Sequence, residues 1–261
     1  MSGVSGISGS SANYYQPLAT GRRINSAADD AAGLSVSEEL DRNATGLDAG
    51  SNNIRSAQDL IKVADGAESQ VSDYLQRMKE LAVAASNDAV VSDDERRAYQ
   101  DEIDQLKKGI ADIAEQTMYN GKRLLDGDGS FSLATDSNGN TASFNVGQST
   151  LRSLGIENFD VTGQFDMSVL DNAIQSVSGN RSSMGASSNG MDYAYNFNTQ
   201  ASYNVTSASS RIADTDYPQA VTEQKKKENL QAYAVLMQKK QQEDEQRRTQ
   251  NFFTNTNIFT S

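Results

Sequence analysis

The chain has 261 residues, a formal net charge of −12, and no Cys, His or Trp. Without Cys or His, the usual zinc, iron–sulfur and copper sites lose their preferred ligands, and the commonest general base is missing. We therefore predict no catalytic residue, no cofactor and no metal site, and a protein that is not an enzyme. The acidic balance disfavours nucleic-acid binding, and no segment approaches the run of about 18 apolar residues that crosses a membrane.

The first residues and the first helix differ sharply in composition. Residues 1–20 are rich in Gly, Ser and Asn, which predicts a flexible segment. They contain neither the charged nor the apolar region of a secretory signal peptide. Asn25 or Ser26 can cap a helix whose first turn carries Asp29 and Asp30, and helical signal continues to about residue 87.

Residues 54–85 show the clearest periodicity. Heptad positions a and d are apolar throughout except at Glu68, which predicts a helix packed along a long seam. After a break, Ser92 and Glu95 form a capping box for a second helix over about 93–117. That helix is expected to stop near Asn120-Gly121, where Asn-Gly offers left-handed geometry.

Residues 121–166 are predicted to form a small β region. Residues 131–133 and 142–146 alternate apolar and polar side chains around Asn138-Gly139, which predicts a hairpin with a type I′ turn. A further short strand is expected at residues 159–161. Long helices are then predicted over 167–213 and over 218–250. In the first, six of the seven positions spaced by seven residues from Leu170 to Ile212 are apolar, Asn198 being the exception.

This element order predicts a mainly α fold: a long antiparallel helical bundle or coiled coil with a small β-hairpin region. The predicted mechanism is packing of helical seams within and between copies of the chain. The residues expected to form this self-assembly and core seam are Ile54, Ile61, Leu75, Met78, Leu170, Val177 and Ile212.

Five segments resemble bacterial flagellins in order and spacing. They are residues 20–33 (TGRRINSAADDAAG), 74–83 (YLQRMKELAV), 100–103 (QDEI), 116–121 (QTMYNG) and 210–217 (SRIADTDY). The resemblance implies a flagellin-like N-terminal helical region at 21–120, the small β region at 121–166 and a flagellin-like C-terminal helix at 167–217. A polar helix and tail follow at 218–261.

The resemblance also implies location, partners and sites. It implies an extracellular subunit that forms a homopolymer, the flagellar filament. It also implies export by the flagellar type III route without a cleaved signal peptide, with an export chaperone and hook-associated proteins as partners. It implies contact with the Toll-like flagellin receptor through Arg77, Leu81 and Glu102, near Lys79, which stands where the family's motif has a second Arg.

The two ends depart from the family pattern. Residues 1–20 replace a longer amphipathic helix, and the last helix ends in the polar run KKQQEDEQRR in place of an Ala-, Gln- and Leu-rich one. A polar helix has little apolar surface to bury against a partner. Two hypotheses therefore stay open: a self-assembling filament subunit, or a secreted flagellin-like or hook–filament junction-type binding protein that does not polymerise by itself. An enzyme is the least favoured class.

Overall fold

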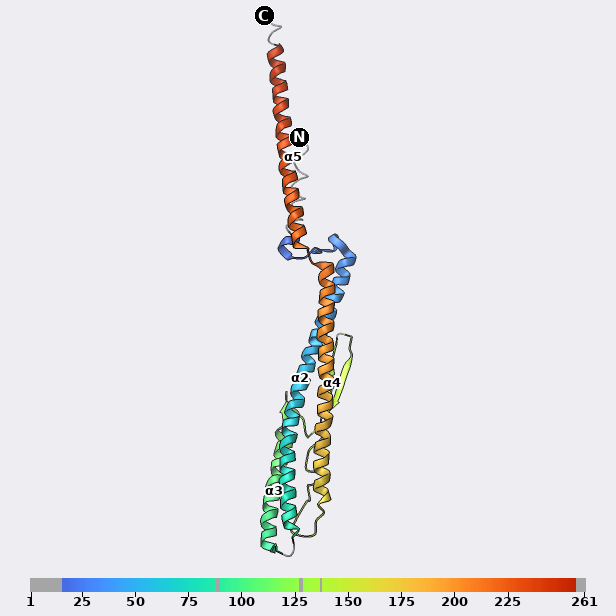
Figure 1. Ribbon diagram of the computed structural model, residues 1–261, viewed down its shortest axis with the longest axis vertical. Coiled ribbons are helices and arrows are strands. Elements are labelled where there is room, and N and C mark those ends of the chain that lie inside the picture. The colour runs from blue at the N-terminus through green and yellow to red at the C-terminus, as the bar shows by residue number, and fades with distance from the viewer. Residues whose placement is uncertain (1–15, 88–89, 127–128, 137, 257–261) are drawn as a thin grey trace. The chain divides into compact units, whose positions relative to one another are not determined.

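The computed structural model describes residues 16–87, 90–126, 129–136 and 138–256, with side chains as far as residue 251. Most of these residues are helical (Figure 1), and the two hairpins are short, which confirms the predicted mainly α fold. The helices and strands are α2 (Ala27–Ala85), α3 (Asp93–Gln116), β1 (Met118–Tyr119), β2 (Lys122–Arg123), β3 (Ser130–Ala134), β4 (Thr141–Asn145), α4 (Ser168–Ala213) and α5 (Tyr217–Thr256).

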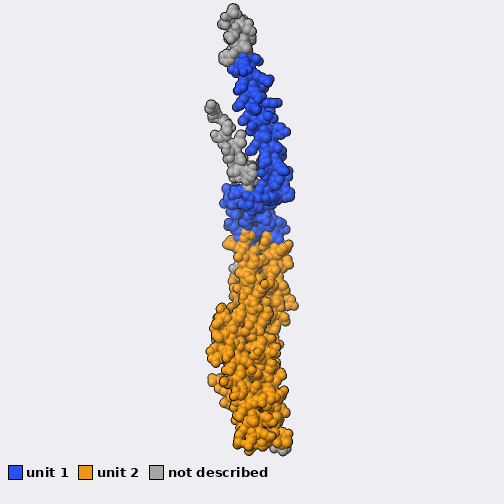
Figure 2. Space-filling model, turned by 90° about the vertical axis from the view of Figure 1, so that its left-hand side faces the viewer, with its two compact units in different colours: residues 1–40, 207–261 blue, residues 41–206 orange. Residues whose placement is uncertain are grey.

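The chain divides into two compact units, coloured separately in Figure 2. Unit 1 contains residues 1–40 and 207–261, and unit 2 contains residues 41–206. Of the segment expected to be flexible, residues 1–15 lie outside the described part. Residues 16–20 are helical instead, and the Gly21 N–H donates to the Pro17 carbonyl at 2.9 Å.

The beginning of α2 differs from the predicted cap. Asp30 has extended backbone angles (φ −164°, ψ 95°), and its carboxylate accepts the Gly33 N–H at 2.9 Å. These are the properties of an N-cap residue, so Asp30 starts the regular helix in place of Ser26. Asp29 holds the preceding turn, because its carboxylate accepts the N–H groups of Asn25 and Ser26 at 3.1 and 2.9 Å.

In unit 2, α2 and α4 run antiparallel, as predicted. Polar pairs join Lys79 to Asp171, Asp65 to Arg181, Gln58 to Asp192, and Asp48 to Ser202. Each step back along α2 is matched by a step forward along α4. Figure 1 shows α3 beside the same pair, so the core of unit 2 is a three-helix arrangement closed by the β segments.

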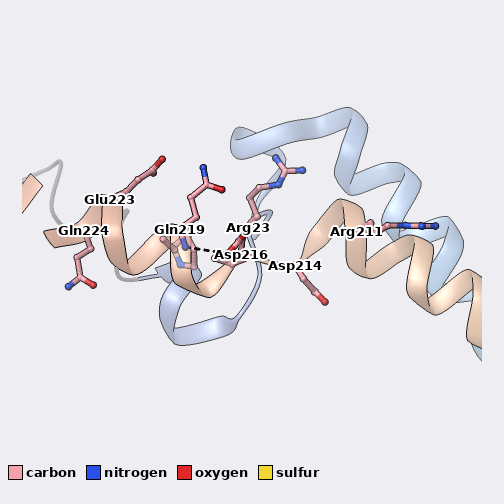
Figure 3. A pocket seen from close by; sticks show the side chains of 10 residues that line it. Arg23, Arg211, Asp214, Asp216, Gln219, Glu223 and Gln224 are labelled. Carbon is pink, nitrogen blue, oxygen red and sulfur yellow. Dashed lines mark hydrogen bonds between the residues drawn. The ribbon is translucent and has the colours of Figure 1, made fainter. Parts of the chain in front are cut away.

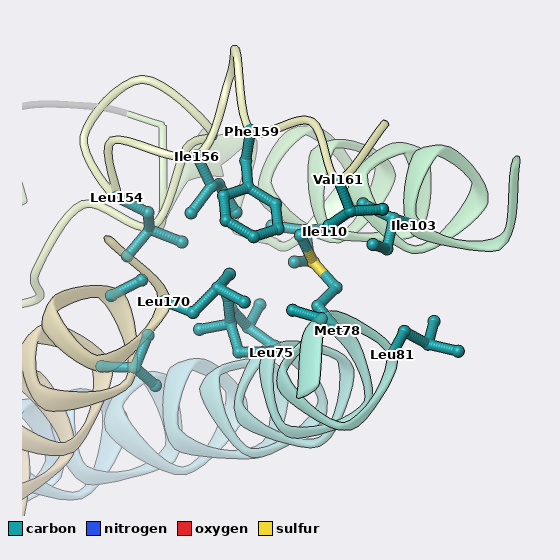
Figure 4. Packing of buried hydrophobic residues seen from close by; sticks show 14 of the residues in the cluster. Leu75, Met78, Leu81, Ile103, Ile110, Leu154, Ile156, Phe159, Val161 and Leu170 are labelled. Atoms are coloured by element: carbon teal, nitrogen blue, oxygen red, sulfur yellow. The ribbon is translucent and has the colours of Figure 1, made fainter. Parts of the chain in front are cut away.

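Two apolar clusters fill unit 2. The first joins Leu75 and Met78 of α2 to Ile103 and Ile110 of α3 and to Leu170 of α4 (Figure 4). The second joins Ile54 and Ile61 to Leu124, Phe144 and Met184. Residues 159–161, expected to form a strand, are irregular: Phe159 and Val161 are buried in the first cluster, and the Val161 N–H donates to the Gln100 side chain at 2.8 Å. Side-chain burial and this one hydrogen bond replace strand pairing there.

The heptad prediction succeeds fully in α2 and partly in α4. All a and d positions from Ile54 to Ala85 are buried, Glu68 included. In α4 the buried row runs from Leu170 to Asn198 and then shifts to Ser202 and Ser209, leaving Val205 and Ile212 half-buried. A straight helix has about 3.6 residues per turn, so a strict seven-residue row drifts off the contact line.

Neither Asn-Gly pair has its predicted role. Helix α3 has the predicted capping box but ends at Gln116, and Asn120 and Gly121 (φ 49° and 75°) instead form the two-residue turn between β1 and β2. Strands β3 and β4 pair as far as Ala134 and Thr141, and the Thr135 N–H donates to the Asn140 carbonyl, so the connection between the strands is longer than a type I′ turn allows. There the Asp136 carboxylate accepts the N–H groups of Asn138 and Asn140, and this stabilises the wider loop.

Candidate functional site

The predicted seam residues lie inside the molecule. Ile54, Ile61, Leu75, Met78, Leu170 and Val177 are at most 4% exposed, all within unit 2. Ile212, in unit 1, is half-buried. Six of the seven side chains therefore contribute to the packing of the subunit itself, and a second copy has no access to them without unfolding.

A different surface of α4 is open. With about 3.6 residues per turn, Tyr193 lies on the side of α4 opposite the buried Met184. We call the exposed row on that side the outer face of α4: Ser182, Ala186, Asn189, Tyr193, Phe197, Gln200 and Asn204. Tyr193 is 78% and Phe197 70% exposed. The seven-residue row identifies only the buried side of α4, so the sequence prediction missed the outer face. The sequence feature that could have identified the outer face is an uncharged helix surface containing two aromatic residues.

The charge on the outer face is unusual for this chain. Between Arg181 and Arg211 the sequence has one charged residue, Asp192, and its carboxylate accepts a hydrogen bond from the Gln58 amide at 2.6 Å. By contrast, about half of the residues of α3 are charged. Unit 2 therefore presents one neutral helix surface and one strongly charged helix surface.

Two of the three expected receptor-contact residues lie together. The Arg77 Nε donates to the Glu102 carboxylate at 2.8 Å and its Nη1 donates to Glu80 at 3.0 Å; these hydrogen bonds raise the pKa of the Arg77 guanidinium, the bond to Glu102 contributing most. Leu81, in contrast, is buried in the first apolar cluster. Arg77 and Glu102 therefore form an ion pair at the surface, whereas the Leu81 side chain is part of the core of unit 2.

In unit 1, the segments that carry the resemblance at 20–33 and 210–217 contact each other. The Arg23 N–H donates to the Ala213 carbonyl at 2.7 Å, and the Thr215 N–H donates to the Gly21 carbonyl at 2.9 Å. A hollow of about 480 Å³ lies beside this pairing, and Figure 3 shows Arg23, Asp214 and Glu223 among the residues around it. Its charged side chains are exposed, so it is a surface groove and not an enclosed ligand site.

Within the described ranges, no cluster of acidic side chains could hold a metal ion. None of the helices in those ranges is long and apolar enough to span a bilayer.

Comparison with known proteins identifies the family of the two helical regions. Residues 2–130 match the bacterial flagellin N-terminal helical region, and residues 167–250 match the bacterial flagellin C-terminal helical region. The chain is 31% identical over 266 residues to a flagellin of Bacillus subtilis, covering 87% of this chain and 88% of that protein. It is 34% identical to a flagellin of Listeria monocytogenes, covering 84% of each.

A solved structure described as a flagellar hook-associated protein of Vibrio parahaemolyticus has the same fold. The TM-score is 0.61 at 14% identity, covering 71% of this chain and all of that one.

Proposed function

We propose that this chain packs against copies of itself through the outer face of α4. The chain belongs to the bacterial flagellin family and is a structural subunit of the flagellar filament. The observation that carries this proposal is the exposure of Tyr193 and Phe197 on an uncharged helix surface. A large exposed apolar side chain contributes most when a partner covers it, because aromatic rings bury a large area at low entropic cost.

Electrostatics favours a second copy as the occupant of this face. Each copy has a formal net charge of −12, so two copies repel each other at long range. Close packing then costs least where each copy presents no charge, which is the case for the outer face of α4. The charged surface of α3 would bring like charges together or require a matched basic partner.

The absence of Cys makes a direct test simple. Single substitutions Tyr193→Cys and Phe197→Cys introduce one thiol each on the outer face, and Asp101→Cys on the exposed surface of α3 is the matched control. Maleimide labelling is measured before and after the protein is brought to assembly conditions and sedimented. We expect labelling at 193 and 197 to fall at least tenfold more than labelling at 101.

The two parts of the proposal fail differently in this experiment. Wild-type protein that never sediments as filaments would overturn the filament role and favour the non-polymerising, junction-type alternative. Filaments in which positions 193, 197 and 101 are protected equally would overturn only the assignment of the face.

The cellular route follows from the filament role. We infer export through the flagellar type III apparatus to the extracellular filament, with a flagellar chaperone and hook-associated proteins as partners. Expression in flagellated cells with and without a working export apparatus tests this: the protein should appear in sheared filaments of the first strain only. Its presence outside the second strain would contradict the route.

Contact with the Toll-like flagellin receptor is a narrower proposal, supported by the exposed pair Arg77 and Glu102. About half of each side chain is exposed, at 49% and 44%. Arg77→Ala and Glu102→Ala should lower the response of receptor-expressing reporter cells, whereas Asp94→Ala, also on the α3 surface, should not. Equal responses for all three variants would remove this pair from the interaction.

A further inference from the structure

Glu68 occupies an interior position that its neighbours in the heptad row fill with apolar side chains. It lies on α2 and is 0% exposed. Its Oε1 accepts hydrogen bonds from the Ser149 hydroxyl at 2.6 Å and, more weakly, from the Asn180 amide at 3.4 Å. Its Oε2 is buried and has no hydrogen-bond partner among the described residues. The carboxyl group therefore joins three segments of unit 2 with half of its acceptor capacity unmet.

The segments around Glu68 are tightly packed. Ser149 is itself 0% exposed, and its N–H donates to the Leu125 carbonyl at 3.1 Å. At Gly147, an added Cβ would lie 2.0 Å from atoms of the Asn180 side chain. The backbone at Gly147 therefore lies directly against the Asn180 side chain. The segments beside Glu68 have little room to rearrange around an ionised carboxylate.

The charged groups that face this site do not neutralise Glu68. Arg181 on α4 is the nearby cation, but its Nε donates to Asp65 at 2.8 Å, one turn before Glu68 on α2. Asp65 adds negative charge, and Asp73 on α2 also acts on Arg181. Ser149 and Asn180 are neutral. Burial raises the pKa of Glu68 above its ordinary value, and this effect outweighs the opposing effects of Ser149, Asn180 and Arg181.

We propose that Glu68 is a proton-binding lock between α2, the segment at 147–149 and α4: the protonated side chain belongs to the packed subunit, and loss of the proton loosens this joint. The inference goes beyond filament formation, because it concerns the folding of a single copy. A buried neutral acid loses less solvation than a buried carboxylate, so protonation removes the larger cost.

The direction of the pH effect follows from the raised pKa. Between the pKa of the unfolded chain and that of the folded subunit, the folded state binds more protons. The stability contributed by Glu68 is therefore complete below the unfolded value and is lost as the pH rises through the folded value. Above the folded-state pKa, the ionised Glu68 side chain contributes none of this stability.

Titration of monomeric protein tests the lock independently of assembly. In wild-type protein carrying ¹³C-labelled Glu, one side-chain carboxyl resonance should titrate clearly above the ordinary Glu range, and it should be missing in Glu68→Gln. Ser149→Ala should move that titration higher, because the hydroxyl stabilises the charged form. A wild-type spectrum in which every Glu titrates at or below its ordinary value would overturn the proposal.

Denaturant unfolding gives a second measurement. Glu68→Gln keeps the shape of the neutral acid, so its unfolding equilibrium constant relative to wild type should change about tenfold for each unit by which the pKa of Glu68 is raised, as the pH increases from 4 to 8. Glu157→Gln, at an exposed carboxylate, is the control and should leave that ratio unchanged. A Glu68→Gln ratio that is the same at every pH would also overturn the lock.

Discussion

The helices of unit 2 and helix α5 of unit 1 contain apolar residues at similar spacing, yet their environments are opposite. In unit 2, the apolar rows of α2 and α4 cover each other and are buried. In α5, Leu230, Tyr233 and Met237 lie one helical turn apart and are more than half exposed. Apolar periodicity thus predicts a helix in both places, but burial also needs a facing partner.

From residue 228 to residue 251, every side chain of α5 is exposed in the described structure. Its sequence is rich in Gln, Lys, Glu and Ala, which favour helix by intrinsic propensity. Unit 2 adds the burial of large side chains from three helices. We therefore expect the two regions to respond very differently to the same kind of substitution.

The largest expected effect is the loss of a core side chain in unit 2. Leu75 is fully buried, so Leu75→Ala should lower the free energy of unfolding by about 2–5 kcal/mol, because it removes apolar contacts and leaves a cavity. Met237→Ala in α5 is the matched control and should change it by less than about 0.5 kcal/mol, as usual at exposed positions. Urea unfolding followed by circular dichroism measures both. Equal losses would mean that α5 is covered by a partner.

A smaller effect is expected from a pair of glycines in α2. At Gly50, an added Cβ would lie 1.8 Å from the Thr135 carbonyl oxygen, whereas Gly66 has open space around it. Gly50→Ala should therefore destabilise unit 2 by about 1–3 kcal/mol. Gly66→Ala should stabilise it by about 0.5–1 kcal/mol, because Ala restricts the unfolded chain. The test is whether the two substitutions change the free energy of unfolding in opposite directions. Destabilisation by both would contradict the close approach of the β3–β4 loop to α2.

The sequence predicts local structure in this chain better than it predicts partners. The capping box at Ser92 and Glu95, the span of α3 and the presence of a hairpin formed by β3 and β4 follow from short-range chemistry, whereas the register of that hairpin differs from the one a type I′ turn at Asn138-Gly139 would give. The seam in α4 was wrong beyond Asn198, since helix twist moves the contact line away from a strict repeat. The roles of the two Asn-Gly pairs depend on the residue at which α3 ends and on the hydrogen bonds that the Asp136 carboxylate accepts. The spacing of residues in the sequence determines neither.

The candidate site was predictable in a narrower sense. Ile54 and Leu75 are buried within unit 2, and periodicity does not separate packing within a chain from packing between chains. Tyr193 and Phe197 are absent from the heptad row because they lie opposite it. In the sequence, Glu68 is only an exception in the apolar row, because its partners Ser149 and Asn180 are distant along the chain and meet it only in the folded structure.

Removal of a helix cap should have a smaller effect than the glycine pair. The Ser92 hydroxyl accepts the Glu95 N–H at the start of α3, and Ser92→Ala should cost about 1 kcal/mol of stability. Ser182→Ala, on the exposed outer face of α4, is the control and should change the free energy of unfolding by no more than a few tenths of a kcal/mol. Thermal unfolding followed at 222 nm compares the two, and equal shifts would indicate that the cap contributes nothing.

The smallest effect concerns two carboxylates that act locally, one in each unit. Hydrogen bonds from Asn25 and Ser26 lower the pKa of Asp29 in unit 1, and hydrogen bonds from Ser92 lower the pKa of Glu95 in unit 2. A lowered folded-state pKa contributes stability that is present above the unfolded value and is lost as the pH falls through the folded one.

Asp29→Asn and Glu95→Gln should each weaken the acid-induced loss of helix between about pH 5 and pH 2, measured by circular dichroism. The direction should be the same in both units, because each carboxylate accepts N–H groups from its own turn of the chain and needs no facing partner, and it is opposite to that expected for Glu68. If only the unit 2 variant responded, the stability of such a local turn would depend on the surrounding core, and the contrast between the units would extend even to hydrogen bonds within one turn.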